Sequence, residues 1–293
     1  MKISGFTFIR NAVQYDYPIV ESIQSILPLV DEMVVALGNS EDDTNDLVKS
    51  INSPKLKFIH TTWDDSLREG GIVLARETDK ALQAVAKDSD WAFYLQGDEV
   101  IHEKDLPVLK SAMEKYLNNK KVEGLLLNYL HFYGSFDYIG SARNWYRHEI
   151  RIIRPNLGIK SFRDAQGFRI NNHKLKVMSV PASVYHYGWV KAPEFQQQKI
   201  RSFNKLWHSD QWVDENIPPV NEFDYSNIRE LQHFDGSHPK VMQTRISRMN
   251  WKFDFDPTAH KLGFKNTFLQ KIEKATSWRI GEYKNYTLLK EKA

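Results

Sequence analysis

The nonapeptide WAFYLQGDE, residues 91–99, joins an apolar run to a polar, acidic ending. Its first five residues are typical of a buried strand in a parallel sheet. Ligands of open parallel sheets bind beyond the carboxyl ends of the strands. Residues 96–99 therefore stand where such a sheet would hold its ligand, and the chain on either side has to supply the neighbouring strands.

The chain before this stretch repeats a pattern of strand followed by helix. The strand-like segments are 3–9, 33–37 and 55–61, and the helix-like segments that follow them are 19–27, 42–51 and 72–86. Pro18 stands at the start of the first helix, where proline is favoured. Strands that alternate with helices predict a parallel sheet with right-handed crossovers.

The second half of the chain is less regular. Helical spacing is found at 105–118 and 193–207, strand patterns at 124–133, 149–154, 173–180 and 183–189, and no clear pattern over 208–245. The tail, 265–293, is helix-prone. We predict one α/β domain over 1–190, divided near residue 100, and a helical extension over 191–293.

The composition excludes several classes of protein. Hydrophobic residues make up 41% of the chain and charged residues 26%, which excludes a disordered or fibrous chain. The absence of cysteine excludes disulfides, zinc–thiolate sites and thiol nucleophiles. A formal net charge of +3 is too near balance for a protein that coats nucleic acid. Because the chain has neither a signal-peptide pattern nor an apolar run of the ~20 residues that span a bilayer, we expect a cytoplasmic protein.

Polar side chains follow every predicted strand of the first half. They are Arg10 and Asn11 after the first, 38–44 after the second, Asp64, Asp65 and Arg68 after the third, and 96–99 after the fourth. Neither the glycine fingerprint of dinucleotide-binding folds nor a Walker loop is present. The expected site therefore belongs to another class of α/β protein.

The run 91–99 resembles the strand and acidic motif of family 2 glycosyltransferases with the GT-A fold. The turn Gly38-Asn39-Ser40-Glu41-Asp42-Asp43-Thr44 is similar to the nucleotide loop of that family, and the helix after Gly70-Gly71, which carries Arg76, is similar to its third helix. The resemblance covers roughly residues 3–190.

The resemblance implies a fold and a reaction. The fold is a Rossmann-like, mostly parallel sheet flanked by helices, with a nucleotide-binding half over 1–100 and a mixed α+β acceptor half over 101–190. The reaction is the transfer of a sugar, with inversion, from a UDP- or GDP-linked donor to a hydroxyl of a saccharide or glycolipid, as in polysaccharide biosynthesis. Two alternatives stay open: a non-catalytic binding protein with a degenerate GT-A fold, and a sugar nucleotidyltransferase, for which Ile9-Arg10-Asn11-Ala12 lacks the usual glycines.

A divalent cation, Mn²⁺ or Mg²⁺, is the cofactor that the resemblance implies. Asp98 and Glu99 carry the oxygen ligands that such cations prefer, and His186 matches a histidine that returns to the metal from the far half of the fold. Gln96 stands where the family usually has an acid. The alternatives are that the two acids begin a loop or cap the helix near Asp105, and that His186 is a core residue.

The remaining candidates are expected to bind the donor and to activate the acceptor. The candidates for nucleotide-sugar binding are Arg10, Asn11, Asn39, Asp42, Asp65, Arg68, Arg76, Gln96, Gly97 and Lys191. The cations among them would stabilise the diphosphate leaving group, or would simply be solvated surface charges. Asp164 is the predicted catalytic base and Glu149 the second choice. The alternative for Asp164 is an exposed ion pair with Arg163 or Arg169.

The tail is basic and aromatic. From residue 251 onward there are nine Lys and Arg against five Asp and Glu, a local charge of +4. Phe264, Phe268 and Trp278 lie among these cations. The tail is therefore expected to dock on the α/β domain, to form a dimer contact, or to lie on an anionic membrane. The last of these would make the protein peripheral at the inner face of the membrane.

Overall fold

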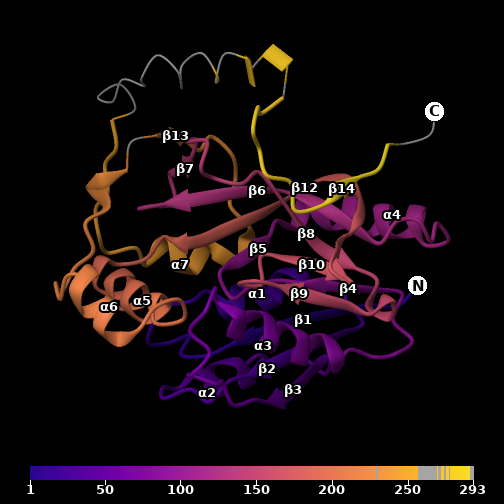
Figure 1. Cartoon of the computed structure of the whole chain (residues 1–293), viewed down its shortest axis with the longest axis horizontal. Helices are drawn as coiled ribbons and strands as arrows, with labels where there is room; N and C mark the ends of the chain where they lie inside the picture. Colours follow the sequence, from indigo (N-terminus) through magenta and orange to yellow (C-terminus); the bar gives the residue numbers. More distant parts are fainter. Residues whose placement is uncertain (229, 257–268, 270–271, 274, 277, 291–293) are drawn as a thin grey trace.

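The first hundred residues fold into the predicted alternation of strands and helices. The computed structural model describes residues 1–228, 230–256, 269, 272–273, 275–276 and 278–290. The strands are β1 (Ile3–Ile9), β2 (Glu32–Leu37), β3 (Leu56–His60) and β4 (Trp91–Tyr94), and the helices are α1 (Ile19–Ile26), α2 (Thr44–Lys49) and α3 (Ile72–Gln83). The four strands pair in parallel in the order β4-β1-β2-β3, which confirms the predicted parallel sheet (Figure 1).

Both faces of this parallel part are covered, because side chains that alternate along each strand enter two different apolar clusters. Ile3, Met33 and Trp91 belong to the cluster that contains the inward face of α1. Phe6 and Val34 belong to the cluster that contains the inward face of α3. The continuous apolar runs of the sequence are thus strands buried on both sides, as in α/β proteins generally.

The second half extends the same sheet with strands that pair both antiparallel and parallel. Its elements are β5 (Glu99–Ile101), α4 (Leu106–Tyr116), β6 (Gly124–Tyr133), β7 (Tyr138–Gly140), β8 (His148–Ile153) and β12 (Lys176–Trp189). With β13 (Leu231–His233) at one edge, the main path of the sheet runs β13-β7-β6-β8-β4-β1-β2-β3, and β12 pairs with β6 and β5 beside it. The short strands β9 (Ile159–Phe162), β10 (Gly167–Ile170) and β11 (His173–Lys174) form a separate sheet. The fold is therefore α/β with a parallel first half and a mixed second half.

Two strands that the sequence predicts as separate form one continuous strand in the structure. The sequence predicts separate strands over 173–180 and 183–189, whereas β12 is continuous from Lys176 to Trp189. Its pairing with β6 shifts register between Ser179 and Ser183, on either side of Pro181. Proline has no N–H to donate to a ladder, so it interrupts the pairing without ending the strand.

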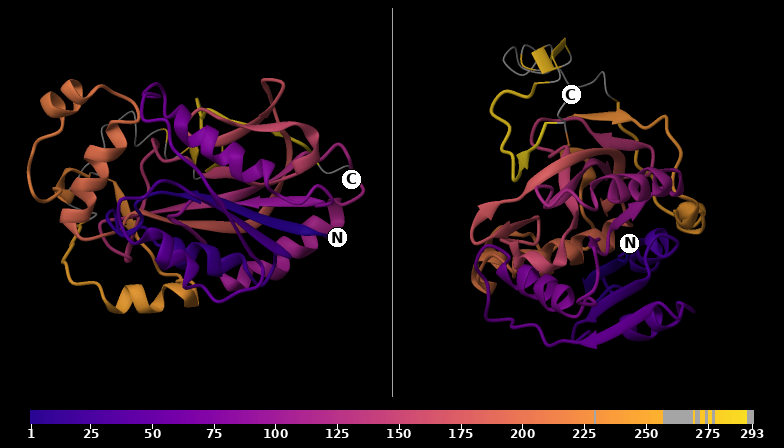
Figure 2. Two further views of the ribbon diagram at one scale, coloured as in Figure 1. Left: turned by 90° about the horizontal axis from the view of Figure 1, so that it is seen from below. Right: turned by 90° about the vertical axis from the view of Figure 1, so that its right-hand side faces the viewer.

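The C-terminal region begins with helices at one end of the sheet and returns with β14 (Thr287–Leu288) to the opposite end, beside the start of β12. It contains α5 (Pro193–Asn204), α6 (Asp210–Asn216), β13 (Leu231–His233), α7 (Gln243–Ser247) and β14 (Thr287–Leu288), so 208–245 is more regular than predicted. Figures 1 and 2 place α5 and α6 at the end of the sheet that lies away from the N-terminus of the chain. The carboxyl end of β1 lies at this same end of the sheet. No helix among the described residues is long and apolar enough to cross a membrane.

The helix expected over 265–293 is present only in part: of the described residues, 269, 272–273 and 275–276 are helical. Residues 265–268, 270–271, 274, 277 and 291–293 lie outside the described residues. The last described part of the tail, 278–290, is not helical: β14 pairs in parallel with β12, and Gly281 has a left-handed backbone with φ of 76°. Glu273 pairs with Arg143 at 2.8 Å, and Glu282 pairs with Arg147 at 2.9 Å. The described part of the tail therefore contacts the α/β domain.

Candidate functional site

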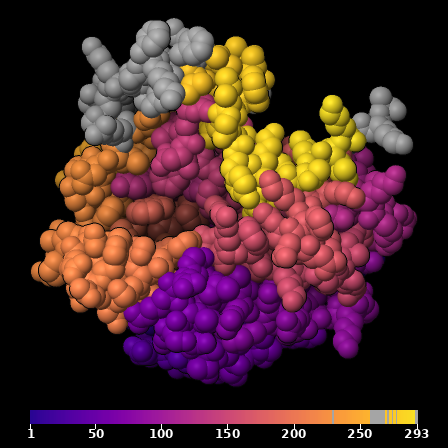
Figure 3. All heavy atoms as spheres, viewed as in Figure 1, coloured from indigo at the N-terminus to yellow at the C-terminus, as the bar shows by residue number. Residues whose placement is uncertain are grey.

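A cavity of about 630 Å³ opens at the carboxyl ends of β1 and β4. Loops after these strands form one wall, and α5 forms the opposite wall. The space-filling view shows the surface hollowed beside α5 and α6 (Figure 3). The cavity lies where the sequence places the ligand of the parallel sheet.

Arg10 and Asp65 form one end of the cavity with the ring of Trp63. Arg10 Nη1 donates to Asp65 Oδ1 at 2.6 Å, and the guanidinium carbon lies 5.7 Å from the centre of the Trp63 ring. Phe8 packs beside Trp63 with ring centres 5.7 Å apart. Gly38 permits this packing, because a Cβ there would lie 2.6 Å from Trp63 Nε1. This end offers flat apolar surface with one cation and one carboxylate.

Four of the ten predicted nucleotide-sugar residues do not line the cavity. The backbone N–H of Trp63 donates to Asn39 Oδ1 at 3.0 Å, and that of Gln14 donates to Asp42 Oδ2 at 2.7 Å, so these side chains hold loops. Arg76 is half-exposed beside Asp64. Lys191 is fully buried and donates to the carbonyls of Tyr15 and Asp16. The residues that do line it are Arg10, Asn11, Asp65, Arg68, Gln96 and Gly97.

Asp98, His186 and Lys199 meet in the middle of the cavity. Asp98 Oδ2 accepts a hydrogen bond from Lys199 Nζ at 3.1 Å and lies 3.6 Å from His186 Nε2. Burial alone would raise the pKa of Asp98, but the charges of Lys199, His186 and Lys191 hold it well below its usual range. The carboxylate is therefore ionised, and its charge is already balanced by an ammonium group.

Glu99 does not reach the cavity, although it follows Asp98 directly. Its carboxylate accepts two hydrogen bonds from the Arg151 guanidinium, at 2.7 and 2.6 Å, and a third from the Tyr129 hydroxyl at 2.5 Å. Both partners of the ion pair are fully buried. Consecutive side chains at the start of a strand point to opposite sides, so Glu99 belongs to the core of β5, β6 and β8.

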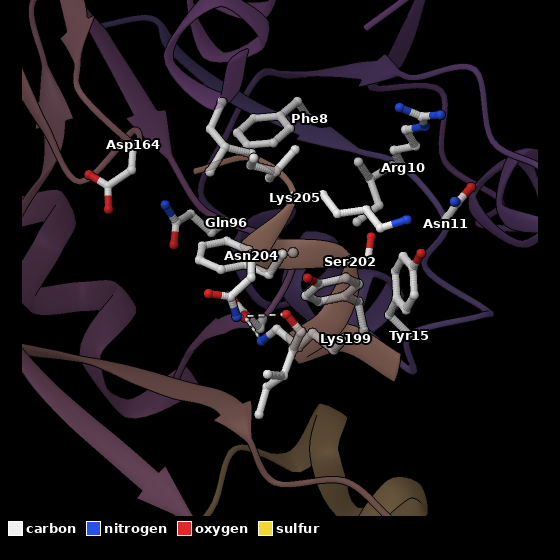
Figure 4. Close-up of a pocket in the computed structure, with 18 of the residues that line it drawn as sticks. Phe8, Arg10, Asn11, Tyr15, Gln96, Asp164, Lys199, Ser202, Asn204 and Lys205 are labelled. Atoms are coloured by element: carbon white, nitrogen blue, oxygen red, sulfur yellow. Dashed lines mark hydrogen bonds and ion pairs between the residues drawn. The ribbon is translucent and has the colours of Figure 1, made fainter. Parts of the chain in front are cut away.

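Asp164 lies at the other end of the cavity, at the tip of the β9–β10 hairpin. Its neighbours Arg163 and Ala165 both have left-handed backbone, with φ of 57° and 63°. The tip rests on Gly71, where a Cβ would lie 2.8 Å from the Cβ of Asp164. Burial raises the pKa of Asp164. In Figure 4 Asp164 and Gln96 lie together, across the cavity from Arg10, Asn11 and Tyr15.

Glu149 lines a second cavity of about 400 Å³. Tyr146 and Gln166 line both cavities, so the two are neighbours. Burial raises the pKa of Glu149 to about 8, although the nearby Arg151 opposes the shift. Glu149 is thus a buried acid that is largely protonated at neutral pH.

The described residues do not fit a resident divalent cation. No three side chains of His, Cys, Asp or Glu gather as a ligand group anywhere in the described part of the chain. Asp98 and His186 remain as a pair, and the Asp98 oxygen that faces His186 also accepts a hydrogen bond from Lys199. Mn²⁺ and Mg²⁺ need several oxygen or imidazole ligands and are repelled by an ammonium group at that distance.

The wall formed by α5 is the part of the site that the sequence analysis missed. Gln196, Lys199, Ile200 and Phe203 follow one another at helical spacing and all line the cavity, as do Ser202 and Asn204. One feature of the sequence could have indicated this wall: Lys199 shares a helical face with Ile200 and Phe203, where an apolar residue would be expected. Arg68, on the opposite side, donates to Asp210 of α6 at 2.8 Å and so links the two walls.

Comparisons with known proteins find solved structures with low sequence identity to this chain. No family model matches the chain, and no curated protein matches it. Among solved structures it is similar to S. aureus TarS in complex with UDP, with 15% identity over 73% of this chain and 69% of that chain and a TM-score of 0.39. For 4-diphosphocytidyl-2C-methyl-D-erythritol synthase from Anaerococcus prevotii the identity is 13%, the shares are 69% and 96%, and the TM-score is 0.41.

A third similar structure is glucosyl-3-phosphoglycerate synthase from Mycobacterium tuberculosis, in complex with Mn²⁺, UDP and phosphoglyceric acid. Its identity is 23% over 45% of this chain and 43% of that chain, with a TM-score of 0.30. With every one of these identities below 25% and every TM-score below 0.5, the likenesses assign no activity to this chain. The chain is an α/β protein whose function has to be inferred from its own cavity.

Proposed function

We propose that this protein is a glycosyltransferase that moves a sugar, with inversion, from a UDP- or GDP-linked donor to a hydroxyl of a saccharide or glycolipid. One observation carries the proposal. A single cavity at the carboxyl end of a parallel sheet joins an aromatic end, a cationic middle and a carboxyl group at the far end. These are the features that a base, a diphosphate and a reacting sugar require, in the order in which a nucleotide sugar presents them.

The donor would lie along the cavity. Its base would stack against Trp63 and Phe8, where Asp65 can accept an N–H of the base. Its diphosphate would lie in the middle, between Arg10 at the aromatic end and Lys199, because the leaving group gains negative charge as the glycosidic bond breaks. The sugar would then reach Gln96 and Asp164. A resident divalent cation is left out of this proposal, since the described residues do not fit one.

Asp164 is the proposed catalytic base. The acceptor oxygen attacks the anomeric carbon, the diphosphate leaves with the electron pair of the broken C–O bond, and the hydroxyl proton moves to the Asp164 carboxylate. Asp164 lines the donor cavity, whereas Glu149 lines the second one. With its pKa near 8, Glu149 is mostly protonated at neutral pH and is a poor proton acceptor there.

The second cavity is the proposed acceptor site. It adjoins the first through Tyr146 and Gln166, and the rings of Trp145 and Tyr283 give it surfaces on which a sugar can stack. For a lipid-linked acceptor, the basic, aromatic tail is the segment that we propose to meet the cytoplasmic face of a membrane.

The first prediction is that one nucleoside diphosphate stabilises the protein against heat. Thermal unfolding is measured with UDP, GDP, CMP, dTDP and ATP in turn. A ligand that binds only the folded state adds about 2.7 kcal/mol to its stability at a hundredfold excess over Kd. We expect UDP or GDP to raise the midpoint and CMP to have a smaller effect, because CMP lacks the second phosphate.

The catalytic part of the proposal is tested with the nucleotide sugar that corresponds to the stabilising diphosphate. Release of the diphosphate in the presence of saccharide acceptors should be lost in Asp164→Asn, while the thermal shift by the diphosphate stays. A diphosphate that binds without any transfer across varied acceptors would favour the non-catalytic binding protein. No shift with any nucleotide contradicts the proposal.

A second prediction concerns Gly188, which allows Asp98 and His186 to approach each other. A Cβ at this position would lie 2.6 Å from Asp98 Oδ2 and 2.6 Å from His186 Nε2. Gly188→Ala is therefore expected to displace both side chains, to destabilise the fold by about 1–3 kcal/mol through overpacking, and to weaken diphosphate binding about tenfold or more. The measurements are urea unfolding and calorimetric titration.

Gly158→Ala is the control for this change. Gly158 has a left-handed backbone with φ of 67°, and no atom of the described residues lies within 4 Å of the position that a Cβ would take there. It does not line the donor cavity. The control is expected to lose stability through backbone strain but to keep its affinity. Equal affinity in Gly188→Ala and the wild type would show that Asp98 and His186 do not contribute to binding.

A further inference from the structure

Lys199 holds an unusual position for a lysine. It lies in α5, and its side chain is only 14% exposed. Its ammonium donates to Asp98 Oδ2 at 3.1 Å and to the Gly188 carbonyl at 2.8 Å, and lies 5.0 Å from the centre of the Tyr17 ring. An ammonium has three N–H donors, so two are used by the protein and one is left to meet a ligand in the cavity that Lys199 lines (Figure 4).

The acidic motif after β4 offers only one carboxylate to this cavity. Gln96 is a neutral amide, and Glu99 is saturated by Arg151 and Tyr129. Asp98 remains, and Lys199 already balances its charge. A divalent cation at Asp98 and His186 would meet this ammonium within a few ångströms, whereas a diphosphate would be attracted by it.

From these contacts we propose that Lys199 supplies the positive charge at Asp98 that binds a nucleoside diphosphate, so that binding needs no divalent metal. The inference rests on the proposed function and names the group that receives the diphosphate. Lysine serves as a compact point charge for phosphate. Asp98 then acts as a positioning residue: its carboxylate, together with the Gly188 carbonyl, holds the ammonium toward the cavity.

Calorimetric titration of the full chain with UDP and GDP tests the inference. Each titration is run with EDTA and, separately, with MnCl₂. The wild-type Kd in EDTA is expected to lie within about threefold of the Kd with Mn²⁺. Such a difference corresponds to well below 1.4 kcal/mol of binding free energy, the amount that changes Kd about tenfold. Lys199→Gln is expected to weaken binding in EDTA about tenfold or more, as the loss of a hydrogen bond to a charged group does.

Lys205→Gln is the matched control. Lys205 lies just after α5, lines the same cavity and carries the same charge, but its ammonium lies 3.6 Å from Asp210 rather than on Asp98. It is expected to lose clearly less affinity than Lys199→Gln. Circular dichroism and the thermal midpoint establish that each variant is folded, and the wild-type comparison of EDTA with Mn²⁺ needs no variant at all.

Two results overturn the inference while leaving the proposed function in place. One is wild-type binding that is lost in EDTA and restored by Mn²⁺, and the other is a folded Lys199→Gln that binds as the wild type does in EDTA. If no diphosphate binds in either buffer, the proposed function fails and the inference fails with it.

Discussion

Replacing Arg151 with methionine is expected to lower the free energy of unfolding by about 3–5 kcal/mol, the cost of leaving one member of a buried ion pair without its partner. Arg151 and Glu99 are both fully buried and joined by two hydrogen bonds. The guanidinium carbon also lies 5.4 Å from the centre of the Tyr94 ring and 5.5 Å from that of the Tyr129 ring. Methionine keeps much of the packing volume, so the loss would come mainly from the uncompensated Glu99 carboxylate.

Urea unfolding followed by circular dichroism measures this loss. Asp214→Asn is the control, because it removes the acidic partner of an exposed ion pair with Arg201, for which about 1 kcal/mol or less is expected. The double variant Glu99→Gln, Arg151→Met should lose less than the sum of the two single changes, since no charge is then left unpaired. If Arg151→Met alone is as stable as the wild type, Glu99 is neutral or solvated in the folded state.

The same pair explains why the sequence could not separate Asp98 from Glu99. Both are acids after a buried strand, and nothing local distinguishes them. Their roles differ because the chain enters β5 at Glu99, which turns this side chain toward Arg151, a residue 52 positions away on β8. That contact depends on the order of strands in the finished sheet, and strand order in this mixed extension leaves no periodic signal in the sequence.

The parallel half, by contrast, could be predicted because its signals are local. Apolar runs set β1, β2 and β4, and Pro18 marks the start of α1. The cavity follows from the rule that ligands bind at the carboxyl ends of such strands. Lys199 could not be predicted in the same way, since it reaches Asp98 across 101 positions through the docking of α5. Asn39 and Asp42 lie at the right end of β2 but hold loops, because short polar side chains bind nearby backbone as readily as ligands.

The stability of the protein is expected to fall between about pH 6 and pH 8 through Glu149. Burial raises the pKa of Glu149 to about 8 from an ordinary value of 4.5; Arg151 opposes the shift, and the acids Glu99 and Asp164 add to it. The folded state therefore holds a proton that the unfolded state has released in this range. This stabilising effect is complete below pH 4.5 and is lost as pH rises toward 8, at up to about 1.4 kcal/mol per pH unit for one group.

Glu149→Gln isolates this contribution, because glutamine resembles the protonated acid in size and polarity. We expect the variant to lose about 2 kcal/mol less stability than the wild type between about pH 6 and pH 8, measured by urea unfolding at each pH. The comparison with the variant is needed because His148, whose pKa is lowered mainly by burial, titrates in the opposite sense. His148 destabilises the folded state as pH falls, which opposes the pH dependence that Glu149 contributes. The wild-type curve alone would therefore underestimate the loss of stability due to Glu149.

Asp164→Asn provides the matched control for this pH dependence. Burial also raises the pKa of Asp164, but this residue is less buried than Glu149 and lies at the edge of the donor cavity, so its removal should flatten the curve less. If Glu149→Gln keeps the full wild-type pH dependence, Glu149 is ionised in the folded protein at neutral pH. It would then be as able as Asp164 to accept a proton, and the second cavity, rather than the first, would become the place to look for the catalytic base.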